Sequence, residues 1–136
     1  MFLDFDRLQR PGSPNHWLLA PAGAAPQPRT HVQEAAFDVA PARLAEGWLG
    51  VVKGQPRTTI RAVSDDGLQI EAEQRSALFG FVDRISFRAI PLGERQSTYT
   101  AYSRSLAGYW DVGVNQDRLG RWAAALRQAV SVDPSR

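Results

Sequence analysis

The chain has 136 residues, a length typical of one domain, and 43% of them are hydrophobic while 22% are charged. It contains no cysteine, which excludes disulfides, thiol catalysis and thiolate zinc sites. Sixteen basic and fourteen acidic residues leave a net charge of +2. So small an excess, spread along the chain, is not typical of a nucleic-acid binder, and we expect no nucleic-acid partner.

The hydropathy of the chain bears on membranes and export. No stretch approaches the roughly 20 apolar residues that a membrane span requires. The amino terminus carries Asp4 and Asp6 where a signal peptide would carry basic residues. We therefore expect a soluble, cytoplasmic protein without a membrane span.

Prolines and glycines interrupt residues 1–35 so often that no apolar period survives in them. We expect this segment to form an irregular arm. Its apolar side chains, among them Phe2 and Trp17, predict that the arm packs on the body of the protein. Residues 36–131 are then expected to form an α+β domain, which makes the chain a single domain overall.

The first regular elements are predicted around residue 40. A short strand is expected at about 34–39, and Pro41 then occupies the position favoured for a first helical residue. Leu44 and Trp48 recur at helical spacing, and Gly54 is a typical residue at a carboxyl-terminal cap. These residues predict an amphipathic helix.

Four strands are predicted in the middle of the chain. Residues 58–63 are β-branched and alternating, and Asp-Asp-Gly at 65–67 favours a hairpin turn. Apolar and polar residues alternate again in 68–73 and 84–89, and a fourth strand is expected at 97–105. Strands so close in sequence most simply pair as an antiparallel meander.

The carboxyl-terminal part predicts a second amphipathic helix. Leu119, Trp122 and Leu126 fall on one helical face, and Asn115 is a good residue for the amino-terminal cap.

The expected fold is a two-layer α+β sandwich: a mainly meander antiparallel sheet with two helices on one face, in the order arm-β-α-β-β-β-β-α. A strongly curved sheet that grips the last helix, as in helix-grip domains, has a similar element order. That alternative would leave a cavity under the sheet.

Three polar segments stand out from this pattern. Residues 13–15 read Ser-Pro-Asn, 75–83 read Arg-Ser-Ala-Leu-Phe-Gly-Phe-Val-Asp, and 103–118 begin Ser-Arg-Ser and end Asn-Gln-Asp-Arg. Together they resemble the domain-of-unknown-function family numbered 1499 of bacteria and plastids, over most of the chain from Asp4 to Leu126. The resemblance implies no activity, substrate or cofactor.

One departure from the family pattern is visible. Members often have a cysteine soon after Ser-Pro-Asn, whereas His16 and Trp17 stand there in this chain. Any role of that cysteine would be absent here.

The late segment suggests an anion site. Arg104 and Arg118 could form a bidentate clamp for a carboxylate or phosphate, with further donors from neighbouring residues and from the start of the last helix. The structural alternative is that Asp83 or Asp111 pairs with these arginines and locks the strand-to-helix corner. The candidate ligand-binding residues are Arg104, Arg118, Asn115, Ser103, Ser105, Asp111, Asp83, Arg75 and Ser76.

Two other groups allow either a functional or a structural interpretation. Phe79 and Phe81 could form an exposed aromatic clamp, or could fold into the core at a bulged corner. A second group could line a polar binding face, but is more typical of a solvated cross-strand charge ladder. Its members are Glu71, Glu73, Arg75, Arg84 and Arg88.

The sequence gives little support for a catalytic site or a metal site. A serine nucleophile needs a base, and both histidines, His16 and His31, lie in the predicted arm, without the spacing of a metal site. We expect no cofactor. The sequence favours a non-catalytic interaction or scaffold domain with an unknown protein partner. The alternatives are binding of a small acidic or amphipathic ligand near the late segment, and a hydrolase-like enzyme that uses Asp83 or Asp111.

Overall fold

The computed structural model describes residues 2–8, 16–21, 30–33, 36–77, 80–106 and 113–131. The elements in chain order are η1 (Phe5–Arg7), β1 (His16–Pro21), β2 (Thr30–Gln33), α1 (Pro41–Lys53), β3 (Thr58–Val63), β4 (Gln69–Arg75), β5 (Val82–Gly93), β6 (Gln96–Ser105) and α2 (Val114–Ser131). No helix within the described ranges is long and apolar enough to cross a membrane.

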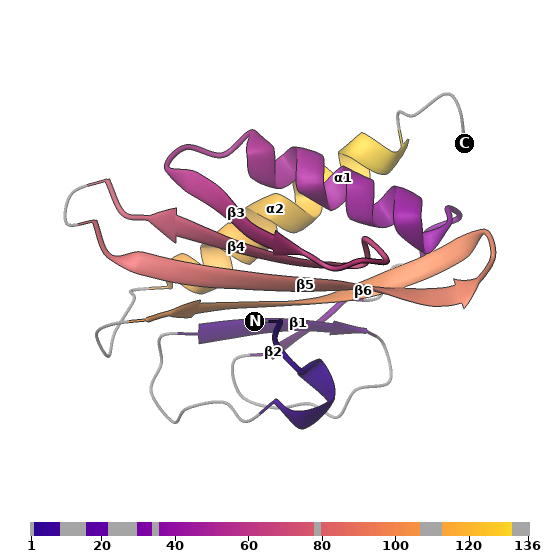
Figure 1. Cartoon of the computed structure of the whole chain (residues 1–136), viewed down its shortest axis with the longest axis horizontal. Coiled ribbons are helices and arrows are strands. Elements are labelled where there is room, and N and C mark those ends of the chain that lie inside the picture. Colours follow the sequence, from indigo (N-terminus) through magenta and orange to yellow (C-terminus); the bar gives the residue numbers. More distant parts are fainter. Residues whose placement is uncertain are drawn as a thin grey trace.

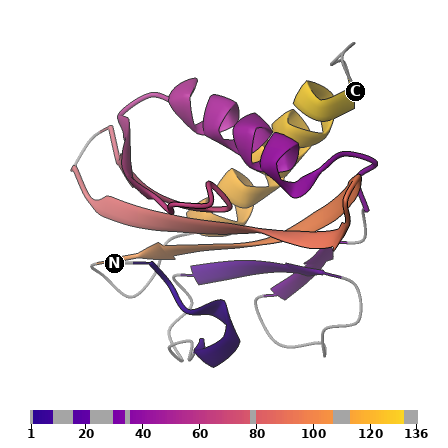
Figure 2. The ribbon, with the colours of Figure 1, turned by 45° about the vertical axis from the view of Figure 1, so that its right-hand side comes forward.

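The strands form one sheet in the order β2-β1-β6-β5-β4-β3 (Figure 1). All neighbouring strands are antiparallel except β1 and β2, which are parallel. Both helices lie on the same face of this sheet, as the turned view also shows (Figure 2). The predicted α+β architecture, with an antiparallel sheet and two covering helices, is confirmed.

Two strands lie inside the segment that was expected to be irregular. Strand β1 pairs with β6 from the far end of the sequence, and β2 pairs with β1. Both runs are short and are bounded by prolines and glycines, so no local pattern indicated them. In place of the short strand expected at 34–39, the described part of that segment holds one isolated bridge, between Phe37 and Ser97.

The space between the sheet and the helices is filled by aromatic side chains. The Trp48 ring of α1 stacks on Phe87 of β5, with ring centroids 4.7 Å apart, and meets Trp122 of α2 edge-on at 5.7 Å. All three side chains are almost completely buried. The helices approach closely where Gly47 lies, since an added Cβ there would stand 3.0 Å from Leu126 Cδ1.

The last helix begins one residue earlier than its expected cap. Gly113 precedes the helix with a φ of +79°, which favours glycine, and its carbonyl accepts from the backbone N–H of Asp117 at 2.9 Å. Asn115, expected at the cap, therefore lies in the first turn of α2, where its side chain is completely buried. That side chain belongs to the polar cluster described next.

Candidate functional site

A buried polar cluster lies between the sheet and the first turn of α2, centred on Arg118. The guanidinium group donates through Nη2 to Asp83 Oδ2 at 2.8 Å and through Nε to Gln74 Oε1 at 2.7 Å. Its Nη1 donates to Ser103 Oγ at 3.0 Å and to Asn115 Oδ1 at 2.9 Å. We call these five residues the Arg118 cluster.

Strand register and helix period assemble this cluster. Gln74 stands opposite Asp83 across β4 and β5. Asn115 and Arg118 are three residues apart, so both project from the same side of α2. Ser103 donates to Asn115 Oδ1 at 2.6 Å, which joins β6 to the helix. The cluster thus ties three strands to one helix.

The centre of the Arg118 cluster is buried, and Gln74 at its edge is half-buried. The side chain of Arg118 is 6% exposed, and the carboxylate of Asp83 pairs with it. Asn115 Nδ2 also donates to Ser105 Oγ at 3.2 Å, so Ser105 borders the cluster. A buried ion pair whose hydrogen bonds are made inside the protein holds the β6–α2 corner in one geometry.

Arg104 lies on the opposite face of the sheet. Successive side chains of a strand point to opposite faces, so Ser103 faces α2 and Arg104 faces away from it. Arg104 donates through Nη1 to Ser86 Oγ at 2.8 Å, and its guanidinium carbon lies 5.1 Å from the centre of the Tyr102 ring. Arg104 and Arg118 therefore do not form the clamp suggested by the sequence.

The amino-terminal residues cover part of the face that carries Arg104. Ser86 donates to Glu71 Oε1 at 2.6 Å, and the backbone N–H of Leu3 donates to Glu71 Oε2 at 3.0 Å. Nearby, Arg88 pairs with Asp6 at 3.2 Å. Glu71, grouped with a solvated charge ladder at the sequence level, is instead 2% exposed.

Burial and charge act in opposite directions on Arg104. Burial lowers the pKa of the Arg104 guanidinium, whereas the Glu71 carboxylate acts to raise it. In the same face, Glu73 pairs with Arg84 at 2.5 Å and lies 3.9 Å from Arg61. The hydrogen bond from Arg84 lowers the pKa of the Glu73 carboxyl.

The remaining candidates lie elsewhere. Arg75 Nη1 donates to the carbonyl of Gly80 at 3.3 Å, and Ser76 Oγ accepts from the backbone N–H of Phe81 at 3.0 Å. Both side chains bond within the β4–β5 connection rather than to Arg104 or Arg118. Asp111, Phe79 and the Ser-Pro-Asn segment at 13–15 lie outside the described residues.

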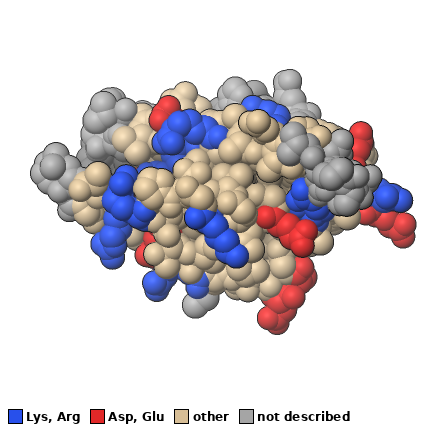
Figure 3. Space-filling view, turned by 90° about the horizontal axis from the view of Figure 1, so that it is seen from above, with Lys and Arg blue, Asp and Glu red and all other residues tan. Residues whose placement is uncertain are grey.

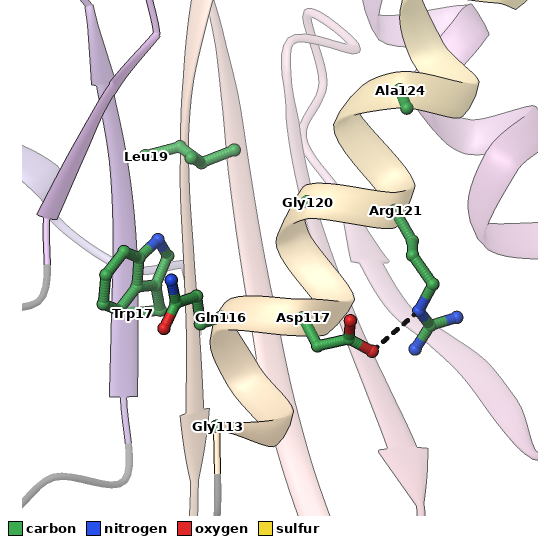
Figure 4. Close-up of a pocket in the computed structure, with 8 residues that line it drawn as sticks. All are labelled: Trp17, Leu19, Gly113, Gln116, Asp117, Gly120, Arg121 and Ala124. Carbon is green, nitrogen blue, oxygen red and sulfur yellow. Dashed lines mark hydrogen bonds and ion pairs between the residues drawn. The ribbon is translucent and has the colours of Figure 1, made fainter.

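A groove of about 630 Å³ lies between β1 and α2 (Figure 4). Its lining consists of Trp17, Leu19, Gly113, Gln116, Asp117, Gly120, Arg121 and Ala124. Trp17 and Leu19 come from β1 and give it an apolar side, while α2 supplies the opposite wall. We call this feature the β1–α2 groove.

The wall of the groove formed by α2 projects little, because Gly120 and Ala124 have small or no side chains there. A Cβ added at Gly120 would meet nothing within 4 Å, although a glycine inside a helix costs stability relative to alanine. Polar groups stand at the rim, where Arg121 Nε donates to Asp117 Oδ2 at 3.0 Å and both side chains are mostly exposed. Sequence reasoning missed this groove because it depends on β1, and a glycine inside the helical period was its one local signal.

The electrostatics of the surface are mixed. On the face seen from above, basic and acidic side chains both appear, and several of them lie beside one another (Figure 3). Within the described ranges, no three histidine, aspartate or glutamate side chains are grouped as metal ligands.

A family model matches most of the chain. Residues 8–126 match the model of a family described as "Protein of unknown function (DUF1499)". No curated protein matches the chain.

Proposed function

Since the chain belongs to DUF1499, a family whose function is unknown, we propose on structural grounds that it is a non-catalytic domain that binds a small amphipathic molecule in the β1–α2 groove. The observation that carries this proposal is the groove itself. Its volume falls within the range of small-molecule sites, about 300–1,000 Å³.

The chemistry of the lining supports an amphipathic occupant. Trp17 and Leu19 offer apolar surface on one side, and Gln116 offers an amide on the other. Arg121 donates to Asp117 through Nε, and both of these charged side chains are mostly exposed at the rim of the groove (Figure 4). An apolar body with one polar or anionic group would match this arrangement.

The hydrogen bonds and the ion pair that the polar side chains make within the protein support a non-catalytic role. Asp83, the acid–base candidate that the structure describes, is paired with Arg118 and is buried. Ser103 and Asn115 bond to each other and to the same arginine. Groups that are held in this way stabilise the corner and are poorly placed to transfer protons to a substrate.

The first test is native mass spectrometry of the gently purified protein together with a probe titration. We expect either a reproducible extra mass that is lost on denaturation, or saturable binding of 1-anilinonaphthalene-8-sulfonate, which joins apolar rings to one sulfonate. A chain that shows neither would contradict the proposal.

The matched variants are Gly120→Phe and Gly50→Phe. Both glycines lie on exposed helix surface with nothing within 4 Å of an added Cβ, but Gly120 lines the groove whereas Gly50 lies on α1 and does not. We expect Gly120→Phe to abolish binding by filling the groove and Gly50→Phe to leave it unchanged. Equal binding by the two variants would place the ligand elsewhere.

A protein-interaction function is the second candidate, and it was the one favoured by the sequence. The observation that supports it is the pair Phe81 and Leu106, both exposed at the same end of the sheet, where the Leu106 N–H donates to the carbonyl of Val82. Loss of a reproducible partner in pull-downs with Phe81→Ser, with binding kept in Gly120→Phe, would favour this function over ligand binding.

Two expectations about surroundings remain predictions. On the face seen in Figure 3, acidic side chains accompany the basic ones, which supports the expectation that nucleic acid is not a partner, because a binder normally gathers basic residues on one face. The cytoplasmic location rests on the sequence argument, and fractionation of cells that produce the full protein would test it.

A further inference from the structure

The sheet face that points away from the helices brings two arginines together. Arg84 of β5 and Arg104 of β6 stand directly opposite each other in the strand register. Glu73 lies beyond Arg84 in the same row, and His16 lies beyond Arg104. Like charges directly opposite each other on neighbouring strands are unfavourable unless other groups compensate them.

The two arginines differ from their neighbours in the way they are compensated. Arg84 pairs with Glu73, and Arg88, four residues further along β5 on the same face, pairs with Asp6. Arg104, which is half-buried, has no carboxylate within ion-pair distance among the described residues, and its guanidinium donates to the neutral hydroxyl of Ser86.

The buried carboxylate that acts on Arg104 is already engaged. Glu71 accepts from Ser86 through one oxygen and from the backbone of Leu3 through the other. Its field acts on Arg104, but no direct ion pair forms between them. A half-buried guanidinium without an ionic partner is unusual, since arginine is rarely taken out of water unless it is paired.

The row also holds more donors than acceptors. Arg84 Nε is buried and has no hydrogen-bond partner. Arg104 donates through Nη1 to Ser86, and its Nε and Nη2 have no acceptor among the residues that the structure describes. The Arg104 guanidinium carbon lies 5.1 Å from the centre of the Tyr102 ring, a distance at which the ring attracts the cation.

We propose that Arg104, with Arg84 beside it, forms an oxyanion-binding site on this face of the sheet. The ligand is a small molecule that carries a carboxylate or a phosphate group, because a planar guanidinium binds these groups through two parallel hydrogen bonds. Its negative charge would supply the ionic partner that Arg104 lacks and would offset the repulsion between the two arginines.

This site is separate from the β1–α2 groove. The groove lies on the helix-covered face and takes no residue from the Arg84–Arg104 pair. The proposal therefore stands or falls independently of the function proposed for the groove.

The test is isothermal titration calorimetry of the full chain with sodium phosphate and, separately, with sodium acetate, at ionic strength matched with sodium chloride. We expect saturable binding of at least one anion. Tighter binding of phosphate would identify a phosphate-bearing ligand, and tighter binding of acetate a carboxylate-bearing one. If neither anion binds more than chloride does, the proposal is wrong.

The informative variant is Arg104→Lys, which keeps the charge but loses the planar fork. We expect it to weaken binding by about tenfold or more, as the loss of a charge-assisted hydrogen bond does. Arg121→Lys, in the groove, is the matched control and should bind as the wild type does. Unchanged binding in Arg104→Lys would overturn the proposal, and a native circular dichroism spectrum would show that each variant is folded.

Discussion

Arg118 and Arg104 come from the same polar segment but lie in opposite surroundings. Arg118 is buried under α2 and is paired with Asp83, with its donors directed to groups of the protein. Arg104, on the other face of the sheet, bonds to a neutral serine, and its Nε and Nη2 have no acceptor among the described residues. Two arginines of one motif therefore differ in their surroundings, since Arg118 is ion-paired under the helix and Arg104 is half-buried on the other face.

The difference follows from the alternation of side chains along β6, in which neighbouring residues face opposite sides of the sheet. Ser103, next to Arg104 in β6, points toward α2 and joins the Arg118 cluster, so Arg104 must point the other way. The helix layer then excludes water from one side, while the other side is covered partly by residues 2–8. The fully buried surroundings of Arg118 and the partly covered surroundings of Arg104 should respond differently to substitution, and the variants below test that contrast.

The largest effect is expected from Arg118→Met compared with Arg104→Met. Loss of Arg118 leaves the Asp83 carboxylate buried without its ionic partner, and we expect the free energy of unfolding to fall by about 3–5 kcal/mol. Loss of Arg104 removes one hydrogen bond and a like charge, so a change of about 1 kcal/mol or less is expected. Urea unfolding monitored by circular dichroism measures both.

The double variant Arg118→Met with Asp83→Leu is the control for this contrast. Replacing both partners of a buried pair by apolar residues removes the isolated charge, and we expect it to recover part of the stability lost in Arg118→Met. If Arg104→Met and Arg118→Met lower the free energy of unfolding by similar amounts, Arg104 is as important for folding as Arg118, and the proposed difference between the two faces is wrong.

A smaller effect on the free energy of unfolding is expected from substitutions at two helical glycines, Gly120 beside the groove and Gly47 between the two helices. Gly120→Ala, on the groove side, should raise the free energy of unfolding by about 1 kcal/mol, because alanine favours a helix and its Cβ meets nothing. Gly47→Ala gains the same preference but places a Cβ 3.0 Å from Leu126 Cδ1 and 3.3 Å from Val130 Cγ2. Overpacking should offset the gain, so Gly47→Ala should be less stable than Gly120→Ala in the same unfolding assay. An equal increase in the free energy of unfolding for both variants would mean that the side chains at the helix–helix contact move aside without cost.

These contrasts also show which features could be read from the sequence. The period of apolar residues correctly predicted α1, α2 and the four strands β3 to β6, because each of these signals is local. Strands β1 and β2 were missed, since β1 is held by β6, about eighty residues away in the chain. Such a pairing has no local periodic signature.

The candidate site was predictable in part. Alternation within the predicted strand at 97–105 already required Ser103 and Arg104 to face opposite sides. Which of them would meet the last helix could not be read from the sequence, because this depends on the position of α2 over the sheet. The Asp83–Arg118 pair was foreseen as the structural alternative, whereas the approach of Leu3 to Glu71 joins residues too distant in sequence to be expected.

The smallest effect concerns the pairs on the open face and their dependence on pH. The pKa of Glu73 is lowered below its ordinary value of 4.5, mainly by the hydrogen bond from Arg84. A carboxyl with a lowered pKa in the folded state contributes stability at pH values above its unfolded pKa, and this contribution is lost as the pH falls through the folded value. Because surface pairs contribute little, we expect Glu73→Gln to lower the free energy of unfolding at pH 7 by about 0.5 kcal/mol.

The difference between Glu73→Gln and the wild type should shrink as the pH is lowered from 7 toward 3, because acid protonates the wild-type carboxyl and removes the same charge. Glu94→Gln, at the exposed β5–β6 turn and without an ion pair to any described residue, is the control, and it should change little at either pH. A loss of several kcal/mol in Glu73→Gln would mean that this face is as tightly closed as the Arg118 cluster. The argument that Arg104 can still accept a ligand would then lose its basis, since it requires a face where charges remain accessible and exchangeable.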